Sequence, residues 1–118
     1  MYEYKCQLIR VVDGDTIDVL IDVGFSTYKK ERIRLYGINT PECRTRNKAE
    51  KILGFAAKAR LKEILKEFGK NFIVKTEIDK KGKYGRILGQ LYDLEMQNCA
   101  NDMMVAEGHA EEYYGGAR

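Results

Sequence analysis

Apolar and polar residues alternate along a central stretch of the chain, residues 33–42. Ile33, Leu35 and, beyond a glycine, Ile38 fit the buried face of one strand, so Arg34 and Tyr36 should point to the other side. The only proline of the chain follows, and the residue before a proline is biased toward extended backbone. The strand is therefore predicted to end where a group of polar residues begins.

Stretches rich in β-branched residues predict four further strands, at residues 4–12, 16–23, 71–78 and 87–92. The first two should form a hairpin, because Asp13-Gly14-Asp15 between them is a turn signal. Residues 24–31 are expected to be a second turn that leads into the central strand. The first part of the chain is thus predicted to be a three-stranded meander.

Two helices are predicted after the central strand. Apolar residues recur at spacings of three and four up to residue 68, and Asn47 followed by Glu50 is a capping box that would begin this long helix. Gly69 should end it, and Gly54 inside it costs about 1 kcal/mol relative to alanine, so we expect close packing there. A short helix over residues 100–107 should end at Gly108, and the tail is too short for another.

Five strands with a long helix between the third and fourth, and a short helix after the fifth, have the order of an OB-fold barrel, an α+β and mainly β architecture. The 118 residues fit a single domain over residues 1–118. No apolar run approaches the roughly 20 residues that span a bilayer, and the N-terminus lacks an apolar signal region, so we expect a cytoplasmic protein.

The cysteines Cys6, Cys43 and Cys99 are odd in number and widely spaced, which predicts free thiols rather than disulfides or a zinc site. Cys43 is expected to be a surface thiol. The net charge of +3 is compatible with a nucleic acid partner but does not argue for one. Basic residues gather around the central stretch and near residues 80–86, which a solvated surface would also explain.

Three separated segments supply complementary polar groups. Asp13-Gly14-Asp15-Thr16 offers carboxylates, residues 34–42 offer a guanidinium, an amide and a carboxylate, and Lys83-Tyr84-Gly85-Arg86 offers a second guanidinium. Oxygen ligands without histidine or cysteine favour a hard cation such as Ca²⁺ or Mg²⁺. Two arginines beside a hard cation indicate a phosphate.

Four motifs resemble, in order and at similar spacing, the signatures of the staphylococcal nuclease (thermonuclease) family. They are Asp13-Gly14-Asp15-Thr16, Arg34-Leu35 leading to Thr40-Pro41-Glu42, Lys83-Tyr84-Gly85-Arg86, and Asn101-Asp102-Met103-Met104-Val105 running to Gly108. The resemblance covers nearly the whole chain. It implies an OB-fold barrel and a calcium-dependent nuclease that hydrolyses DNA and RNA with low sequence specificity, leaving 3′-phosphate ends.

The resemblance also implies a role for each matching residue. Calcium would be held by Asp15, Asn39 and the backbone carbonyl of Thr40. Glu42 would orient or deprotonate the attacking water, and the phosphate would be bound by Arg34 and Arg86. The nucleotide pocket would be formed by Tyr84 and by Tyr113 or Tyr114. Asn39 replaces an aspartate of the family, and because its amide brings no charge we expect a raised calcium requirement.

Two other classes of function remain open. The barrel could be a nucleic-acid-binding module without turnover, or a protein-interaction barrel whose arginines pair with carboxylates. The presence of both arginines and of Asp15 and Glu42 favours the enzyme, whereas Asn39 keeps the binding module open. We expect a monomer that acts on DNA and RNA, with single strands preferred and no membrane partner.

Overall fold

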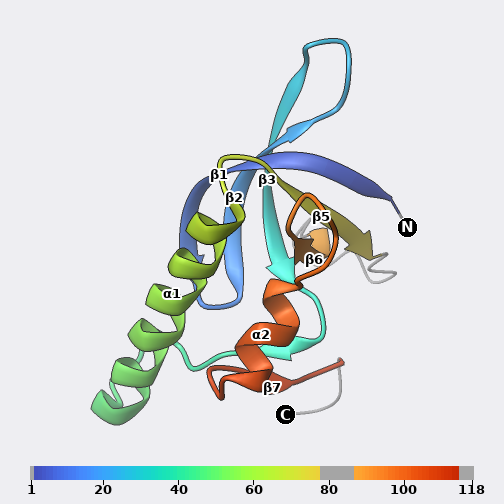
Figure 1. Ribbon diagram of the computed structural model, residues 1–118. Coiled ribbons are helices and arrows are strands. Elements are labelled where there is room, and N and C mark those ends of the chain that lie inside the picture. The colour runs from blue at the N-terminus through green and yellow to red at the C-terminus, as the bar shows by residue number, and fades with distance from the viewer. Residues whose placement is uncertain (1, 78–86, 115–118) are drawn as a thin grey trace.

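Five strands close into a barrel in the computed structural model of the chain, which describes residues 2–77 and 87–114 (Figure 1). In order around the barrel they are β1 (Glu3–Asp13), β2 (Thr16–Asp22), β3 (Tyr28–Leu35), β6 (Ile87–Tyr92) and β5 (Phe72–Glu77). β3 pairs with β6 in parallel, and the other neighbours in the barrel pair antiparallel. The predicted OB-fold barrel is confirmed.

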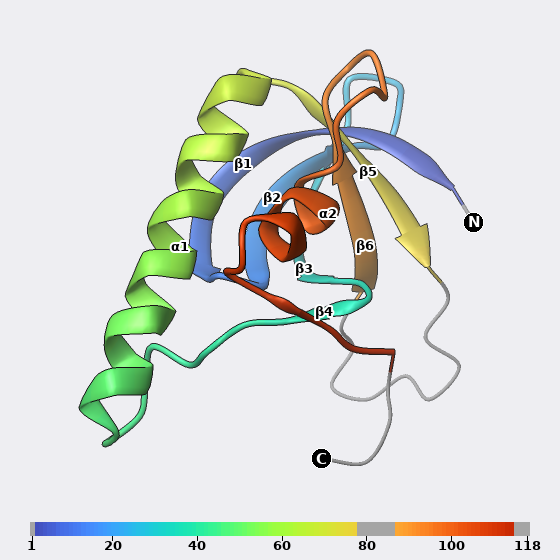
Figure 2. The same ribbon diagram turned by 60° about the horizontal axis from the view of Figure 1, so that its bottom comes forward.

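In the described part of the chain, two helices pack outside the barrel. α1 (Lys48–Phe68) precedes β5 and lies along one side, and α2 (Ala100–Ala106) follows β6 (Figure 2). Asn101 ties α2 to the barrel, because its buried amide group donates to the carbonyls of Tyr36 and Gly89 and accepts from the Leu91 N–H. Within the described residues no helix is long and apolar enough to cross a membrane.

The ends of α1 follow the sequence signals in most respects. The side chain of Asn47 accepts hydrogen bonds from the N–H groups of Ala49 and Glu50, at 3.0 and 3.1 Å. A capping box would also contain a hydrogen bond from the N–H of Asn47 to the side chain of Glu50. Here the N–H of Asn47 donates to the Thr45 hydroxyl instead, at 3.2 Å. Gly69 ends the helix with a φ of 102°, a backbone region that favours glycine.

The core fills the barrel and the space under α1. Ile33 and Leu35 on β3 are 0 and 1% exposed, so the buried face predicted for this part of the central strand is confirmed. Ile38 is also buried, at 3% exposure, but it lies on a separate strand, β4 (Ile38–Asn39). The prediction of one strand that continues past Gly37 is wrong, because the chain turns there with a φ of 79°. From α1, three residues join the same cluster, namely Leu61, Ile64 and Leu65. The apolar face of the helix therefore fixes its position against the barrel.

One further local prediction is wrong, and one short strand was not predicted. The expected turn over residues 24–31 is shorter, because β3 begins at Tyr28 and pairs with β2 from Asp22 onward. Strongly charged residues at the start of β3 hide the strand pattern there. The unpredicted strand lies in the tail, where β7 (Glu111–Glu112) pairs with β4 (Ile38–Asn39) (Figure 2).

Candidate active site

A pocket opens where the turn between β1 and β2 meets the segment that follows β4. Of the predicted site residues, it brings together Asp15, Arg34, Asn39, Thr40 and Glu42, which come from three separate parts of the chain. The rest of its lining consists of Arg10, Val12, Asp13, Thr16, Arg32, Pro41, Cys43 and Arg44. The grouping expected from the sequence is therefore present for these five residues.

A network of polar contacts joins four of these residues. The Oδ2 atom of Asp15 accepts a hydrogen bond from the N–H of Thr40 at 3.2 Å and lies 3.5 Å from Nη2 of Arg34. The same Nη2 atom donates to Oδ1 of Asn39 at 3.1 Å. The side chains of Arg34 and Asp15 are 15 and 13% exposed, so the guanidinium and the carboxylate are held in fixed positions.

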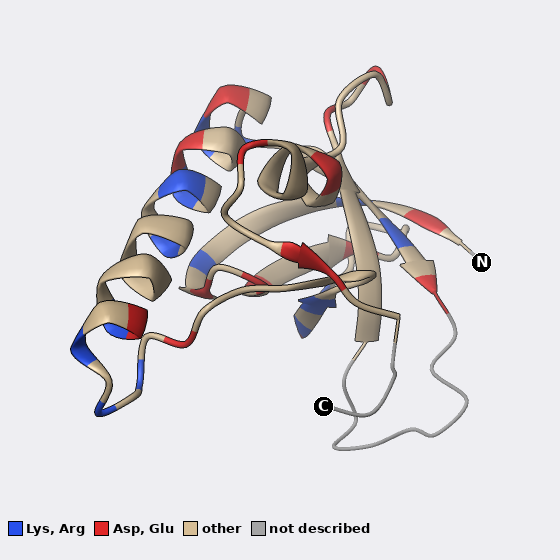
Figure 3. Cartoon of the chain, turned by 90° about the horizontal axis from the view of Figure 1, so that it is seen from below, with Lys and Arg blue, Asp and Glu red and all other residues tan. Residues whose placement is uncertain are grey.

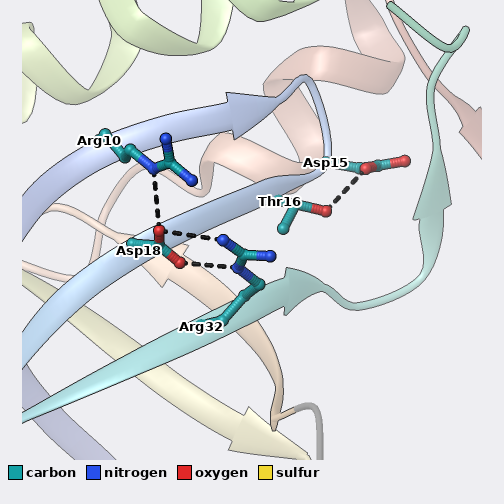
Figure 4. Close-up of polar contacts among 5 residues, drawn as sticks. All are labelled: Arg10, Asp15, Thr16, Asp18 and Arg32. Carbon is teal, nitrogen blue, oxygen red and sulfur yellow. Dashed lines mark hydrogen bonds and ion pairs between the residues drawn. The ribbon is translucent and has the colours of Figure 1, made fainter. Parts of the chain in front are cut away.

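The strands explain why these groups meet. Thr16 on β2 is the register partner of Arg34 on β3, and the N–H of Leu35 donates to the carbonyl of Asp15 at 2.8 Å. Thr16 also donates its hydroxyl proton to Oδ1 of Asp15 at 3.0 Å (Figure 4). The chain then turns at Gly37, whose φ is 79°, and brings β4 back toward the turn. Backbone pairing thus places the site on rigid elements.

Two small residues of α1 let the helix approach both segments of the site. A Cβ atom on Gly54 would lie 2.5 Å from the carbonyl oxygen of Glu42, which confirms the expected close packing. A Cβ atom on Gly14, in the turn between β1 and β2, would lie 2.8 Å from the Cβ atom of Ala57. The helix therefore supports the backbone on both sides of the pocket.

The thiol of Cys43 is buried, at 6% exposure, so the expectation of a surface thiol is wrong. Its pKa is raised by burial and, to a lesser degree, by the neighbouring Asp13 carboxylate. Burial also raises the pKa of the Cys6 thiol to about 12 and that of Cys99. All three thiols are free, as predicted.

The donor atoms of the pocket fit a hard cation in their chemistry. Asp15 offers a carboxylate, Asn39 an amide oxygen and Thr40 a backbone carbonyl, and Ca²⁺ prefers such oxygen ligands. Within the described residues no group of three or more His, Cys, Asp or Glu side chains is arranged to hold a metal ion. The candidate set thus carries one negative charge, with the Arg34 guanidinium beside it.

Of the aromatic residues predicted for the nucleotide pocket, Tyr114 lies elsewhere and Tyr84 is outside the described residues. Tyr114 packs edge-to-face on Tyr36, with ring centroids 5.6 Å apart, and lines a separate hollow beside α2. The N–H of Tyr113 donates to the carbonyl of Gly37 at 2.8 Å. The other two predicted residues, Tyr84 and Arg86, lie outside the described residues. The structure therefore does not bring Tyr114 into the pocket that holds Arg34 and Glu42.

One charged cluster beside the pocket was not singled out from the sequence. Asp18 on β2 accepts hydrogen bonds from Arg10 on β1 and Arg32 on β3 (Figure 4). The hydrogen bond from Arg32 is the main reason why the pKa of Asp18 falls to about 2. The only feature of the sequence that pointed to this cluster was the number of basic residues around the central stretch. Figure 3 shows further basic residues between β4 and α1 and at the start of α1.

Comparison with known proteins adds independent support for the resemblance. Residues 32–117 match the family model described as "Staphylococcal nuclease homologue". A micrococcal nuclease of Shigella flexneri is 31% identical, over 96% of this chain and 62% of its own length. The endonuclease YhcR of Bacillus subtilis is 36% identical, over 95% of this chain and 9% of that protein.

An uncharacterised protein of Methanocaldococcus jannaschii is 30% identical, over 93% of this chain and 59% of its own length. The chain therefore spans about three fifths of that protein and of the Shigella nuclease, at 59 and 62% of their lengths. The family model covers the part of the pocket from Arg32 to Arg44 and begins after Asp15.

Proposed function

Because the chain belongs to the staphylococcal nuclease family, we propose that it is a calcium-dependent nuclease that hydrolyses the phosphodiester bonds of DNA and RNA. Single strands would be preferred, sequence specificity would be low, and the products would carry 3′-phosphates. The site lies within one chain, so the proposed active form is a monomer. The observation that supports this function best is the pocket that gathers Arg34, Asp15 and Glu42 from separate segments.

The chemistry of the reaction explains why these groups would act together. When water attacks a phosphodiester, negative charge builds up on the equatorial oxygens of the phosphorus. A guanidinium fixed at that position stabilises the transition state more than the ground state, and loss of such a donor costs about 3 to 4 kcal/mol of barrier. Arg34 is the described residue that would act in this way, because Asp15 and Asn39 hold its Nη2 atom.

Glu42 is the candidate for handling the attacking water. Its side chain lines the pocket and is exposed, so water can reach the carboxylate. The carboxylate would orient that water for in-line attack and accept its proton. Gly54 fixes the backbone that carries it.

The proposed calcium ligands are Asp15, Asn39 and the Thr40 carbonyl. When bound, the ion supplies positive charge beside the phosphate. Asn39 already accepts a hydrogen bond from Arg34 and brings no charge. For this reason we propose that the protein needs more calcium than a site with aspartate at this position.

The lack of charge on Asn39 also favours the second candidate, a nucleic-acid-binding barrel without turnover. If the Asp15 carboxylate alone does not retain calcium beside Arg34, the pocket would still attract phosphate but would not promote hydrolysis. Binding without cleavage at every calcium concentration would support this candidate.

Product analysis tests the proposed nuclease directly. Single-stranded DNA and RNA labelled at the 5′ end are incubated with the protein and calcium, and the fragments are treated with a phosphatase that removes 3′-phosphates. We expect fragments of many lengths from both substrates, each with a mobility shift after phosphatase treatment. Fragments with 3′-hydroxyl ends, which do not shift, would contradict the proposed reaction.

A further inference from the structure

A row of three charged side chains crosses the barrel next to the candidate active site. Asp18 on β2 is the register partner of Arg10 on β1 and of Arg32 on β3. Figure 4 shows the Asp18 carboxylate between the two guanidinium groups, on the strands that lead to Asp15 and Thr16. Strand pairing therefore sets the position of both arginines.

Asp18 holds the arginines but leaves part of each one open to solvent. Its side chain is 8% exposed, and its oxygens accept from Nε of Arg10 at 3.0 Å and from Nε and Nη2 of Arg32 at 2.8 and 3.3 Å. The Arg10 and Arg32 side chains are 62 and 49% exposed. One carboxylate thus orients two guanidinium groups, and the cluster keeps a net positive charge with N–H groups available for an anion.

The cluster is continuous with the candidate active site. Arg10 and Arg32 line the same pocket as Arg34 and Glu42. Arg32 and Arg34 are two residues apart on β3, so they share one face of the strand at a separation of about 6.6 Å along it. This separation is similar to that of neighbouring phosphates on one nucleic acid strand.

The basic face continues beyond the cluster. Lys30 is two residues before Arg32 on β3 and lines an adjoining hollow with Arg10 and Arg32. Besides Asp18, the carboxylates that line the pocket are Asp13, Asp15 and Glu42. Glu31 lines the adjoining hollow and pairs with Lys29 at 3.0 Å. Cations therefore follow β3 on one face, away from the position proposed for the scissile phosphate.

We propose that Arg10 and Arg32, oriented by Asp18, form a second phosphate-binding subsite for the nucleotide next to the cleaved bond. The ligand is a single-stranded polynucleotide. Lys30 binds the phosphate that follows the one bound by Arg10 and Arg32. This inference rests on the proposed nuclease function. It predicts that affinity depends on the number of phosphates in the ligand, which a purely structural ion cluster would not cause.

The test measures binding without cleavage, in the Glu42→Gln background with calcium present. A fluorescently labelled oligothymidylate of eight nucleotides is titrated by anisotropy at several salt concentrations, and a thymidine dinucleotide with one phosphate is measured by competition. Arg10→Gln and Arg32→Gln are each expected to weaken octamer binding about fivefold. Each should also lower the salt slope by about 0.7, the value for one phosphate contact on a single strand.

The matched control is Lys62→Gln, which removes the same charge from an exposed position of α1 that lines neither hollow. Dinucleotide binding should be unchanged in both arginine variants. Equal octamer affinity and salt slope in these variants and in the Lys62 control would overturn the subsite and leave the nuclease proposal standing. A background protein that binds neither ligand would overturn both.

Thermal melts check that each variant folds. If Arg32→Gln does not fold, Arg10→Gln decides the test alone, since Arg10 makes one bond to Asp18 and is the more exposed of the two. A normal melt together with the fivefold loss would support the subsite. A normal melt with no more loss than the Lys62 control shows would overturn it.

Discussion

Gly54 of α1 lies so close to Glu42 that a Cβ atom on residue 54 would stand 2.5 Å from the Glu42 carbonyl oxygen and 2.6 Å from its carbonyl carbon. It would also stand 2.9 Å from the backbone nitrogen of Cys43. Backbone cannot yield as a flexible side chain can, so a larger residue would displace this segment. The helix thus determines where the candidate carboxylate stands.

Gly54→Ala is therefore expected to lower nuclease activity more than tenfold. The free energy of unfolding should fall by about 1 to 3 kcal/mol from overpacking, even though alanine favours a helix. The measurement is kcat/KM on single-stranded DNA, together with urea unfolding. Ala59→Gly, at an exposed position of α1, is the control, because it should cost about 1 kcal/mol and leave activity unchanged. Full activity in Gly54→Ala would show that Glu42 is not positioned by this contact.

The Asp18 carboxylate should make stability depend on acid pH. Its pKa is lowered from 3.8 to about 2, chiefly by the hydrogen bond from Arg32, so its contribution is complete above about pH 4 and is lost as the pH falls toward 2. Both arginines are about half exposed, and solvent screening reduces the expected contribution to about 1 kcal/mol.

Urea unfolding of the wild type and of Asp18→Asn between pH 7 and pH 2 measures this contribution. The wild type should be the more stable protein at pH 7, and the difference should shrink as Asp18 becomes protonated between about pH 4 and pH 2. A difference that is independent of pH would mean that the carboxylate charge is not what stabilises the cluster.

Asn39→Asp should lower the calcium concentration needed for half-maximal activity on the order of tenfold. The substitution adds a second negative charge to the proposed ligand set, and ligand charge is one of the main determinants of calcium affinity. The measurement is a calcium titration of DNA hydrolysis by both proteins. An unchanged calcium requirement would argue against Asn39 as a ligand.

The thiols should react slowly in the folded protein. Cys6, Cys43 and Cys99 are buried, and burial raises the pKa of each, so little thiolate is available at pH 8. With Ellman's reagent, we expect almost no fast reaction in buffer and three equivalents in denaturant. One fast equivalent in buffer, lost in Cys43→Ser, would show that the pocket opens to expose this thiol.

Local patterns were sufficient to predict most of the fold. Apolar alternation located the strands, and the cap at Asn47 and the stop at Gly69 bounded α1 within one residue. The pairing of β4 with β7 was missed, because two residues form too short a strand to show a period. The early start of β3 was missed because charged residues on both faces conceal the alternation.

Only those residues of the candidate site that belong to a sequence motif could be predicted. Asp15, Arg34 and Glu42 stand in motifs, and the fold brings them to one pocket. The contacts of Asp18 with Arg10 and Arg32 depend on strand register, which no local pattern specifies. The burial of Cys43 was missed for a similar reason, because it depends on how closely α1 packs.

The nuclease proposal is tested most directly by the release of acid-soluble nucleotides from denatured DNA across a calcium titration. Wild type, Glu42→Gln and a wild-type sample with chelator are assayed side by side, and thermal melts confirm that both proteins are folded. We predict release that rises with calcium, stops with the chelator and is lost in Glu42→Gln. No release by the folded wild type at any calcium concentration, while the same DNA remains bound, would contradict the nuclease and favour the binding barrel.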